Sequence, residues 1–141
     1  MKIVFIACVS MKQTVPVPAG QLYISPLFKY GLQYAKSLQP DYIGILSAKH
    51  GLLNLETVTA PYDQTLVTAK TIELKQWSNI VLEQIKQRFN LETDEFIFLA
   101  GSKYRKYLIP HIKQWSAPLC TMGIGKQLQF LKNHAINSNR V

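Results

Sequence analysis

The sequence predicts one small α/β domain with a three-layer α/β/α arrangement around a four-stranded, mostly parallel sheet. Short apolar runs at residues 2–8, 42–46 and 96–99 lack polar alternation, which is typical of strands covered on both faces. Segments with helical spacing separate these runs, and this alternation favours parallel strands joined by right-handed crossovers. A chain of 141 residues suits a single domain with a real core.

The first two helices are predicted from capping signals and apolar stripes. Ser25 and Pro26 supply an N-cap and a first helical residue, and Pro40 ends the helix that they begin. The longest helix is expected over about 68–89, where apolar residues recur at helical spacing. A third helix should open at Ser102 and be interrupted near residue 110.

The C-terminal part is expected to add a fourth strand and a last helix. Residues 118–122 are short and begin at a proline, which suits a strand at the sheet edge. The last helix should carry one apolar stripe, made of Ile124, Leu128, Leu131 and Ala135. We expect the domain to span residues 1–136 and residues 137–141 to form a frayed tail.

The charge balance favours a polyanionic partner. Sixteen Lys and Arg face eight Asp and Glu, for a formal charge of +8, and no acidic residue follows Glu95. Nucleic acid or a nucleotide is therefore the expected partner, although many soluble proteins are moderately basic. The first apolar run is too short to span a bilayer, so no membrane partner is expected. With only Cys8 and Cys120, a disulfide framework is not expected, which favours the cytoplasm.

The expected site lies beyond the carboxyl ends of the strands, where open α/β sheets bind ligands. Residues 47–67 are expected to connect the second strand to the longest helix without regular structure, and connections of that length are usually functional. Gly101-Ser102 and the turn at Gly125 precede helices, so their backbone N–H groups can hold a phosphate or carboxylate. Both turns are equally compatible with a purely structural role.

Several familiar nucleotide sites are excluded by residue identity. Leu128 stands where a dinucleotide fingerprint needs its third glycine, and the chain has no P-loop. The cysteine phosphatase pattern also fails, because Thr14 takes the place of its arginine. The three histidines show no metal-ligand spacing, and we expect His111 and His134 to face solvent. No metal or redox cofactor is predicted.

The strongest candidates for chemistry are His50 and Asp63. His50 follows Lys49 in a predicted turn, and like-charge repulsion should lower its pKa and favour neutral imidazole. Asp63 is one of few acids in basic surroundings and should stay ionised, although an aspartate there is also typical of a turn or helix cap. Cys8 is either a structural strand-end residue or a nucleophile activated by Lys12 or His50.

Tyrosines alternate with basic residues in two parts of the chain. Aromatic rings beside cations are typical of surfaces that stack bases and bind phosphates, although tyrosines at helical spacing also serve as packing. The tyrosines are Tyr23, Tyr30, Tyr34, Tyr104 and Tyr107, and the cations are Lys29, Lys36, Lys103, Arg105 and Lys106.

A set of local motifs resembles the DUF6884 family. The resemblance is detailed over about residues 1–66 and looser up to residues 123–131, so it covers nearly the whole domain. Its most specific part is Ser47-Ala48-Lys49-His50-Gly51-Leu52-Leu53, and the others are Cys8-x-x-x-Lys12, Pro16-Val17-Pro18-Ala19, Leu22-Tyr23-Ile24-Ser25-Pro26-Leu27-Phe28-Lys29 and Pro61-Tyr62-Asp63-Gln64-Thr65-Leu66.

The DUF6884 family is similar to the uracil-DNA-glycosylase-like superfamily. This resemblance implies a parallel sheet flanked by helices and an activity on nucleic-acid bases, DNA being favoured over RNA. Some members look like antiphage glycosylases that act on modified bases. The water-activating motif of uracil glycosylases is absent near Cys8, so catalytic roles are not carried over.

The leading hypothesis is cleavage or exchange at a base–sugar N-glycosidic bond. Asp63 would face the sugar cation or hold the attacking water, His50 would donate to the departing base, and Tyr23 would stack on an extruded base. The predicted catalytic residues are Asp63, His50 and Lys49. The predicted substrate- and phosphate-binding residues are Cys8, Ser10, Lys12, Tyr23, Ser25, Ser47, Tyr62, Gly101, Ser102 and Gly125.

Two other functions fit the same residues. One is a nucleic-acid or nucleotide-binding module without catalysis, which needs the basic surface but not Asp63. The other is an enzyme for a small phosphorylated or nucleoside substrate. Salt separates these classes, because only a polynucleotide binder weakens steeply with ionic strength.

Overall fold

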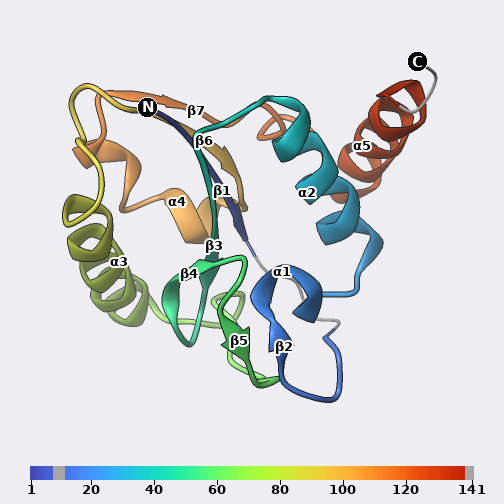
Figure 1. Cartoon of the computed structure of the whole chain (residues 1–141). Coiled ribbons are helices and arrows are strands. Elements are labelled where there is room, and N and C mark those ends of the chain that lie inside the picture. Colours follow the sequence, from blue (N-terminus) through green and yellow to red (C-terminus); the bar gives the residue numbers. More distant parts are fainter. Residues whose placement is uncertain (8–11, 139–141) are drawn as a thin grey trace.

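The fold is a sheet with helices on both of its faces (Figure 1). The computed structural model describes residues 1–7 and 12–138, with side chains as far as residue 134. The strands in these residues are β1 (Lys2–Ala7), β2 (Val17–Pro18), β3 (Tyr42–Ser47), β4 (Gly51–Asn54), β5 (Val58–Thr59), β6 (Glu95–Leu99) and β7 (Gln114–Ser116). The helices are α1 (Ala19–Leu22), α2 (Pro26–Ser37), α3 (Thr71–Lys86), α4 (Ser102–Arg105), the 3₁₀ turn η1 (Ile109–His111) and α5 (Ile124–Ser138).

The main sheet has β1 at its centre. Within the described residues it contains five strands in the order β4-β3-β1-β6-β7. β3 and β6 flank β1 in parallel, and β7 is parallel to β6 at one edge. β4 is antiparallel to β3 at the other edge. The predicted mostly parallel sheet is therefore confirmed, and the three strong apolar runs are its inner strands, but the predicted number of four strands is wrong.

The predicted strand at 118–122 is also wrong. These residues form a turn, in which Cys120 N donates to Ala117 O at 3.0 Å and Met122 N donates to Leu119 O at 3.1 Å. Pro118 has no N–H for a ladder, and the amides after it are used locally. The edge strand is β7, whose residues are exposed. A search for apolar runs overlooks such a strand because it contributes little to the core.

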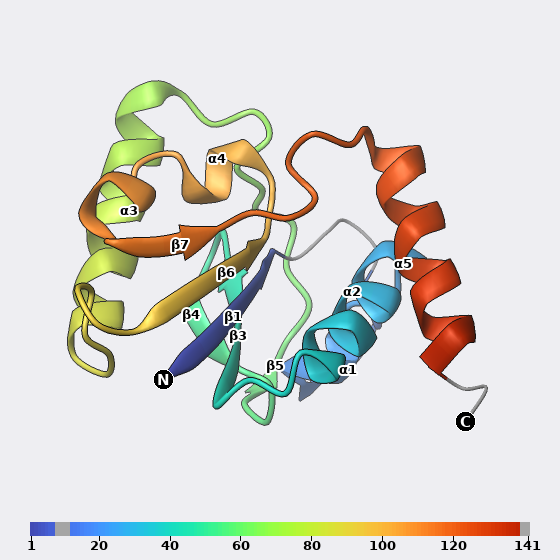
Figure 2. The ribbon, with the colours of Figure 1, turned by 90° about the horizontal axis from the view of Figure 1, so that it is seen from above.

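Alternate side chains of β1 enter two separate parts of the core. Ile3 and Phe5 pack with the buried faces of α3 and α4, whereas Val4 and Ile6 pack with α1 and α2. Figure 2 shows α3 and α4 on one side of the sheet, α1 and α2 on the other, and α5 outside α2. A strand covered on both faces needs apolar side chains at successive positions, which explains the apolar run Ile3–Ile6.

The helices begin close to the predicted positions but differ in length. Ser25 Oγ accepts a hydrogen bond from Phe28 N at 3.2 Å, so the predicted N-cap of α2 is confirmed. α3 is shorter than expected, and the helix that opens at Ser102 has only four residues. In α5, Leu131 is buried but Ile124 is 74% exposed, so the predicted stripe does not extend to the start of this helix. No helix in the described part of the chain is long and apolar enough to cross a membrane.

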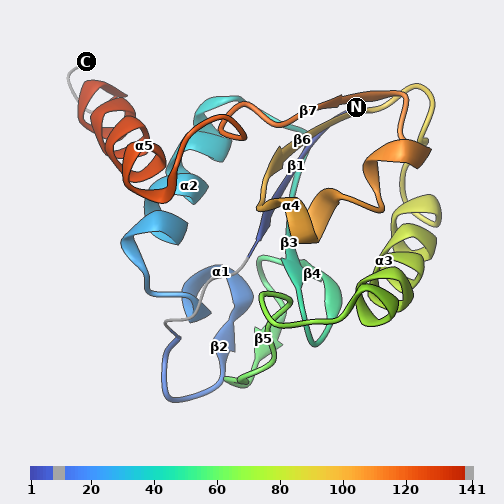
Figure 3. The ribbon, with the colours of Figure 1, turned by 180° about the vertical axis from the view of Figure 1, so that it is seen from behind.

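Residues 47–67 contain regular structure, contrary to the expectation. β4 forms a hairpin with β3, and β5 pairs with β2 in a separate two-stranded sheet (Figure 3). The hairpin turn requires Gly51, whose φ of 71° lies in the left-handed region. The side chain of Gln84 in α3 fills the space beside Gly51, and its Oε1 accepts a hydrogen bond from Leu52 N at 2.9 Å.

Gly51→Ala is expected to destabilise the fold by about 1–3 kcal/mol, because it combines a left-handed φ with a clash against Gln84 Oε1. Gly31→Ala is the matched control. A Cβ at Gly31, in the middle of α2, would meet nothing within 4 Å, so this change should stabilise by about 0.4–1 kcal/mol. Urea unfolding measures both, and equal effects of the two variants would contradict the assignment.

Candidate functional site

A cavity of about 330 Å³ lies where β1 and β6 end. The chain crosses from β1 to β3 on one side and returns to β6 on the other side of β1, so the strand order reverses here. Open α/β sheets bind ligands beyond strand ends at such a point. The cavity is lined by Ala7, Lys12, Leu27, Gln64, Thr65, Val67, Gly101, Tyr104, Ile124 and Gln127. The cavity therefore lies at the end of the sheet where the sequence analysis expected the site, which makes it the candidate site.

A chain of buried hydroxyl groups adjoins this cavity. Ser47 Oγ donates to Tyr62 OH at 2.7 Å, and the hydroxyls of Tyr62 and Tyr23 are 2.6 Å apart. His50 N donates to Ser47 Oγ at 3.1 Å. These contacts bring together four residues that the sequence analysis proposed, from the end of β3, from residue 62 and from the segment before α2.

Lys12 links the hydroxyl chain to the cavity. Its Nζ lies 4.7 Å from the ring centroid of Tyr62 and 5.8 Å from that of Tyr23, both within the range of a cation–π contact. Lys12 also forms an antiparallel bridge with Tyr23 and lines the cavity. The structure therefore places one cation at the wall of the cavity, held by two aromatic rings.

His50 also contacts Tyr62. Its ring meets that of Tyr62 edge to face, with the centroids 5.4 Å apart. Partial burial lowers the pKa of His50 below its ordinary value, and the nearby Lys49 ammonium lowers this pKa further. The predicted direction is thus confirmed, although burial and not Lys49 is the larger cause. Lys49 itself is exposed.

Asp63 is exposed and faces a second cavity of about 420 Å³, which it lines with Glu73 and Trp77. Gln64 and Thr65 line both cavities and form the wall between them. Among the described residues no hydrogen bond, ion pair or ring contact joins Asp63 to His50, so the two predicted catalytic residues are not brought together directly.

Tyr23 has a structural role that the sequence analysis did not assign, and Ser25 has the capping role that it did assign. The Tyr23 side chain is only 1% exposed, and its ring packs 5.0 Å from that of Phe28, so the expected stacking on an extruded base is contradicted. Its hydroxyl joins the hydrogen-bonded chain, and its ring lies 5.8 Å from Lys12 Nζ. Ser25 is buried and caps α2, which occupies the oxygen that was expected to bind substrate.

The expected anion-binding turns are exposed at the end of the sheet where the cavity lies. Gly101 precedes α4 and lines the cavity, with Ser102 next to it, and Gly125 lies in the first turn of α5. α4 has only four residues, so its aligned peptide dipoles add little field. Cys8 and Ser10 lie outside the described residues.

The other aromatic and histidine predictions have mixed outcomes. Tyr104 is buried, and Tyr34 packs against Phe130 and His134, so neither offers a free stacking face. His134 is half-buried, with its Nε2 2.9 Å from Ser37 Oγ, and the prediction that it faces solvent is wrong. His111 is exposed, as predicted. No cluster of three or more His, Cys, Asp or Glu fit for a metal occurs in residues 1–7 and 12–138.

Seven residues that line the cavity were not proposed for the site by the sequence analysis: Ala7, Leu27, Gln64, Thr65, Val67, Ile124 and Gln127. Gln64 and Thr65 follow Asp63 within a motif already singled out, so their neighbourhood was a usable signal. Val67 and Ile124 are apolar but 66% and 74% exposed, and both line the cavity. Apolar residues are ordinarily expected in the core, so no sequence signal distinguished these two.

Charge is unevenly distributed between the two ends of the sheet. Cations follow each inner strand or begin the last helix: Lys12, Lys49, Lys103 and Lys126. Four of the eight acidic residues lie at the opposite end of the sheet, where β3 and β6 begin: Asp41, Glu92, Asp94 and Glu95. The end of the sheet that carries the cavity is therefore the end that favours an anion.

Comparisons with known proteins identify a family without an assigned activity. The DUF6884 family, described as a family of unknown function, matches residues 3–133. The uncharacterized protein YfjM of Bacillus subtilis (strain 168) is 32% identical over 130 residues, which cover 86% of this chain and 81% of that protein. No solved structure matches the chain.

Replacement of Tyr62 by Phe tests the hydroxyl chain. The change removes the hydrogen bonds to Ser47 and Tyr23 and should lower the free energy of unfolding by about 1–3 kcal/mol, because both partners are buried. Tyr30→Phe, in the half-buried surface of α2, is the control and should have almost no effect. The denaturant midpoints of wild type and the two variants measure this effect. Equal midpoints would show that the hydrogen-bonded chain of hydroxyls does not stabilise the fold.

The titration of His50 gives a second test. Its NMR midpoint should lie below the usual value of about 6.5. Lys49→Gln should raise this pKa only part of the way, because burial is the larger cause, whereas Lys113→Gln at the opposite edge should not change it. Since the folded-state pKa is depressed, the linked stability is fully present above the unfolded-state value of about 6.5 and is lost as the pH falls from there through the lower folded-state pKa. An identical midpoint in wild type and Lys49→Gln would exclude the charge effect.

Proposed function

We propose that this chain, which belongs to the DUF6884 family, binds DNA and cleaves the N-glycosidic bond between a base and its sugar. The observation that carries the proposal is the cavity of about 330 Å³ at the reversal of strand order, with the Lys12 ammonium in its wall. Its volume falls in the range of small-ligand sites, and its mixed lining suits a flat ring with polar edges.

The cavity offers different groups to the faces and to the edges of such a ring. Val67 and Ile124 come from separate segments and are exposed, so they are available for contact with the ring faces. Gln64, Thr65 and Gln127 supply donors and acceptors for the edges. A cavity of this size holds one base and not a pair, so the target is a base in single-stranded DNA or one extruded from a duplex.

The surrounding charge supports a polynucleotide as the partner. Lys49, Lys103 and Lys126 lie at the same edge as the cavity and are exposed, which allows contact with flanking phosphates. The helices on both faces of the sheet and the site beyond its strand ends are consistent with the three-layer, uracil-DNA-glycosylase-like fold that the sequence resembles. Residence in the cytoplasm is part of the same proposal.

Glycosidic cleavage separates two charges that need different partners. In the hydrolysis, the oxygen of a water bonds to C1′ of the sugar, the C–N bond breaks, and its electron pair leaves with the base. Lys12 offsets the negative charge that develops on the base, a role first suggested for His50, which does not line the cavity. Asp63, next to the shared wall, stabilises the sugar cation and accepts the proton of the water, which finally passes to the base.

Formation of abasic sites tests this function. The substrates are single-stranded oligonucleotides that contain each normal base or a modified pyrimidine, and alkali then cleaves the strand at abasic sites. Asp63→Asn and Lys12→Met are each expected to lower the rate by about 100-fold or more. The matched controls are Glu92→Gln and Lys113→Met, which lie at the end of the sheet away from the cavity and should keep the wild-type rate. Equal rates in all five proteins would refute the assigned roles.

A binding module without catalysis is the second candidate, favoured by the separation of Asp63 from His50. It predicts no abasic sites on any substrate, together with DNA binding that Lys12→Met weakens and Asp63→Asn does not. The same binding assay, repeated across salt concentrations, identifies the ligand class. Affinity for a polynucleotide should fall steeply with salt, whereas affinity for a mononucleotide should change little.

A further inference from the structure

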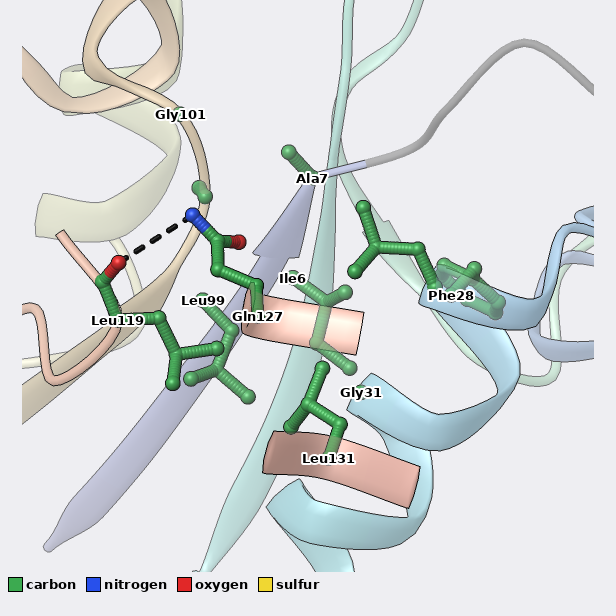
Figure 4. Close-up of a pocket in the computed structure, with 11 residues that line it drawn as sticks. Ile6, Ala7, Phe28, Gly31, Leu99, Gly101, Leu119, Gln127 and Leu131 are labelled. Atoms are coloured by element: carbon green, nitrogen blue, oxygen red, sulfur yellow. Dashed lines mark hydrogen bonds between the residues drawn. The ribbon is translucent and has the colours of Figure 1, made fainter. Parts of the chain in front are cut away.

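A smaller cavity, called the inner cavity, adjoins the cavity of about 330 Å³, which is called the outer cavity. Its volume is about 90 Å³, and it shares Ala7, Leu27, Gly101 and Gln127 with the outer cavity. Its remaining lining is almost wholly apolar, from Ile6, Phe28, Gly31, Leu99, Ala100, Leu119 and Leu131 (Figure 4). Such a lining favours an apolar ligand group over a polar one.

Gly31 keeps the inner cavity open. It lies in the middle of α2, is buried, and lines the cavity, yet a Cβ at this position would meet nothing within 4 Å. Glycine is among the least favourable residues in a helix interior, and here no neighbouring atom requires it. Alanine would therefore fit and would strengthen the helix. The reason that remains for glycine is the space itself.

Gln127 marks the boundary between the two cavities. Its Nε2 donates to Leu119 O at 3.2 Å and to Met122 O at 2.9 Å, and these two bonds fix the orientation of the amide. Figure 4 shows the amide nitrogen turned toward Leu119 and the carbonyl oxygen on the opposite side. A ligand that spans the boundary thus meets a fixed polar group first and apolar side chains beyond it.

We infer that the inner cavity receives a small apolar substituent of the base whose ring occupies the outer cavity. This inference rests on the proposed function and narrows its substrate class. An apolar cavity of about 150 Å³ holds the six carbons of benzene, so by proportion this one holds about three or four carbon atoms. Pyrimidines with a methyl or similarly small alkyl group at carbon 5 are the simplest bases of this class.

The test compares two single-stranded oligonucleotides that differ only in the 5-methyl group, one with a central deoxythymidine and the other with a central deoxyuridine. Binding is measured in Asp63→Asn protein, so that both strands stay intact. Without a further change, the methylated strand should bind about 4-fold tighter or more, the factor expected for burial of one methyl group. Gly31→Val fills the inner cavity with three carbons and should reduce the ratio to about one.

Two further variants separate the cavity from effects on the helix. Gln33→Val places the same side chain on the exposed surface of α2 and should keep the preference for the methylated strand. Gly31→Ala adds a single carbon, should leave the fold intact, and should give a ratio between those of Gly31 and Gly31→Val.

Equal affinity for the two strands before any change at Gly31 would overturn the inference and leave the proposed function standing. A preference that survives Gly31→Val in folded protein would also overturn it. Failure to bind either strand, whatever residue occupies position 31, would refute the proposed function and the inference together.

Discussion

The hydrogen bonds from Ser47 through Tyr62 to Tyr23 hold the site together. They join the end of β3, the segment that leads to α3, and Tyr23, which lies two residues before the cap of α2. Trp77 adds a bond from α3, because its Nε1 donates to Ser47 O at 2.9 Å. Buried hydroxyls are costly unless they are paired, so these segments have one favourable arrangement. The positions of Lys12, His50 and residues 63–65 all follow from it.

This arrangement separates the groups by chemistry. The Lys12 ammonium is held over two rings and faces the outer cavity, whereas Asp63 lies beyond the wall formed by Gln64 and Thr65. In the proposed reaction, the cation on one side of this wall would face the base and the carboxylate on the other side would face the sugar. The inner cavity adds an apolar end to the same path. A ligand that extends from the outer into the inner cavity would therefore contact polar groups at one end and apolar groups at the other.

Gly51 and Gly31 are glycines for two different physical reasons. Gly51 is required by its own backbone, because its φ is positive and Gln84 occupies the space beside it. Gly31 has ordinary helical surroundings and open space instead. The first glycine is therefore explained by the fold, and the second by the volume that it leaves empty.

The sequence by itself determined the elements whose signals are local. The inner strands are apolar because both faces are covered, α2 begins where Ser25 can cap it, and the strand ends carry cations beside glycine turns. The end of the sheet where the outer cavity lies was expected from these facts alone. The depression of the His50 pKa was also predictable in direction, since Lys49 is its neighbour in the chain.

Only the tertiary structure decided which side chains meet and which are covered. It buried the ring of Tyr23, exposed Ile124 at the cavity, and placed Asp63 and His50 in different surroundings. It also paired β4 with β3 and β7 with β6, where short edge strands leave weak patterns. The physical reason is that the direction of a side chain and the pairing of an edge depend on packing between segments far apart in sequence, which residue order alone does not specify.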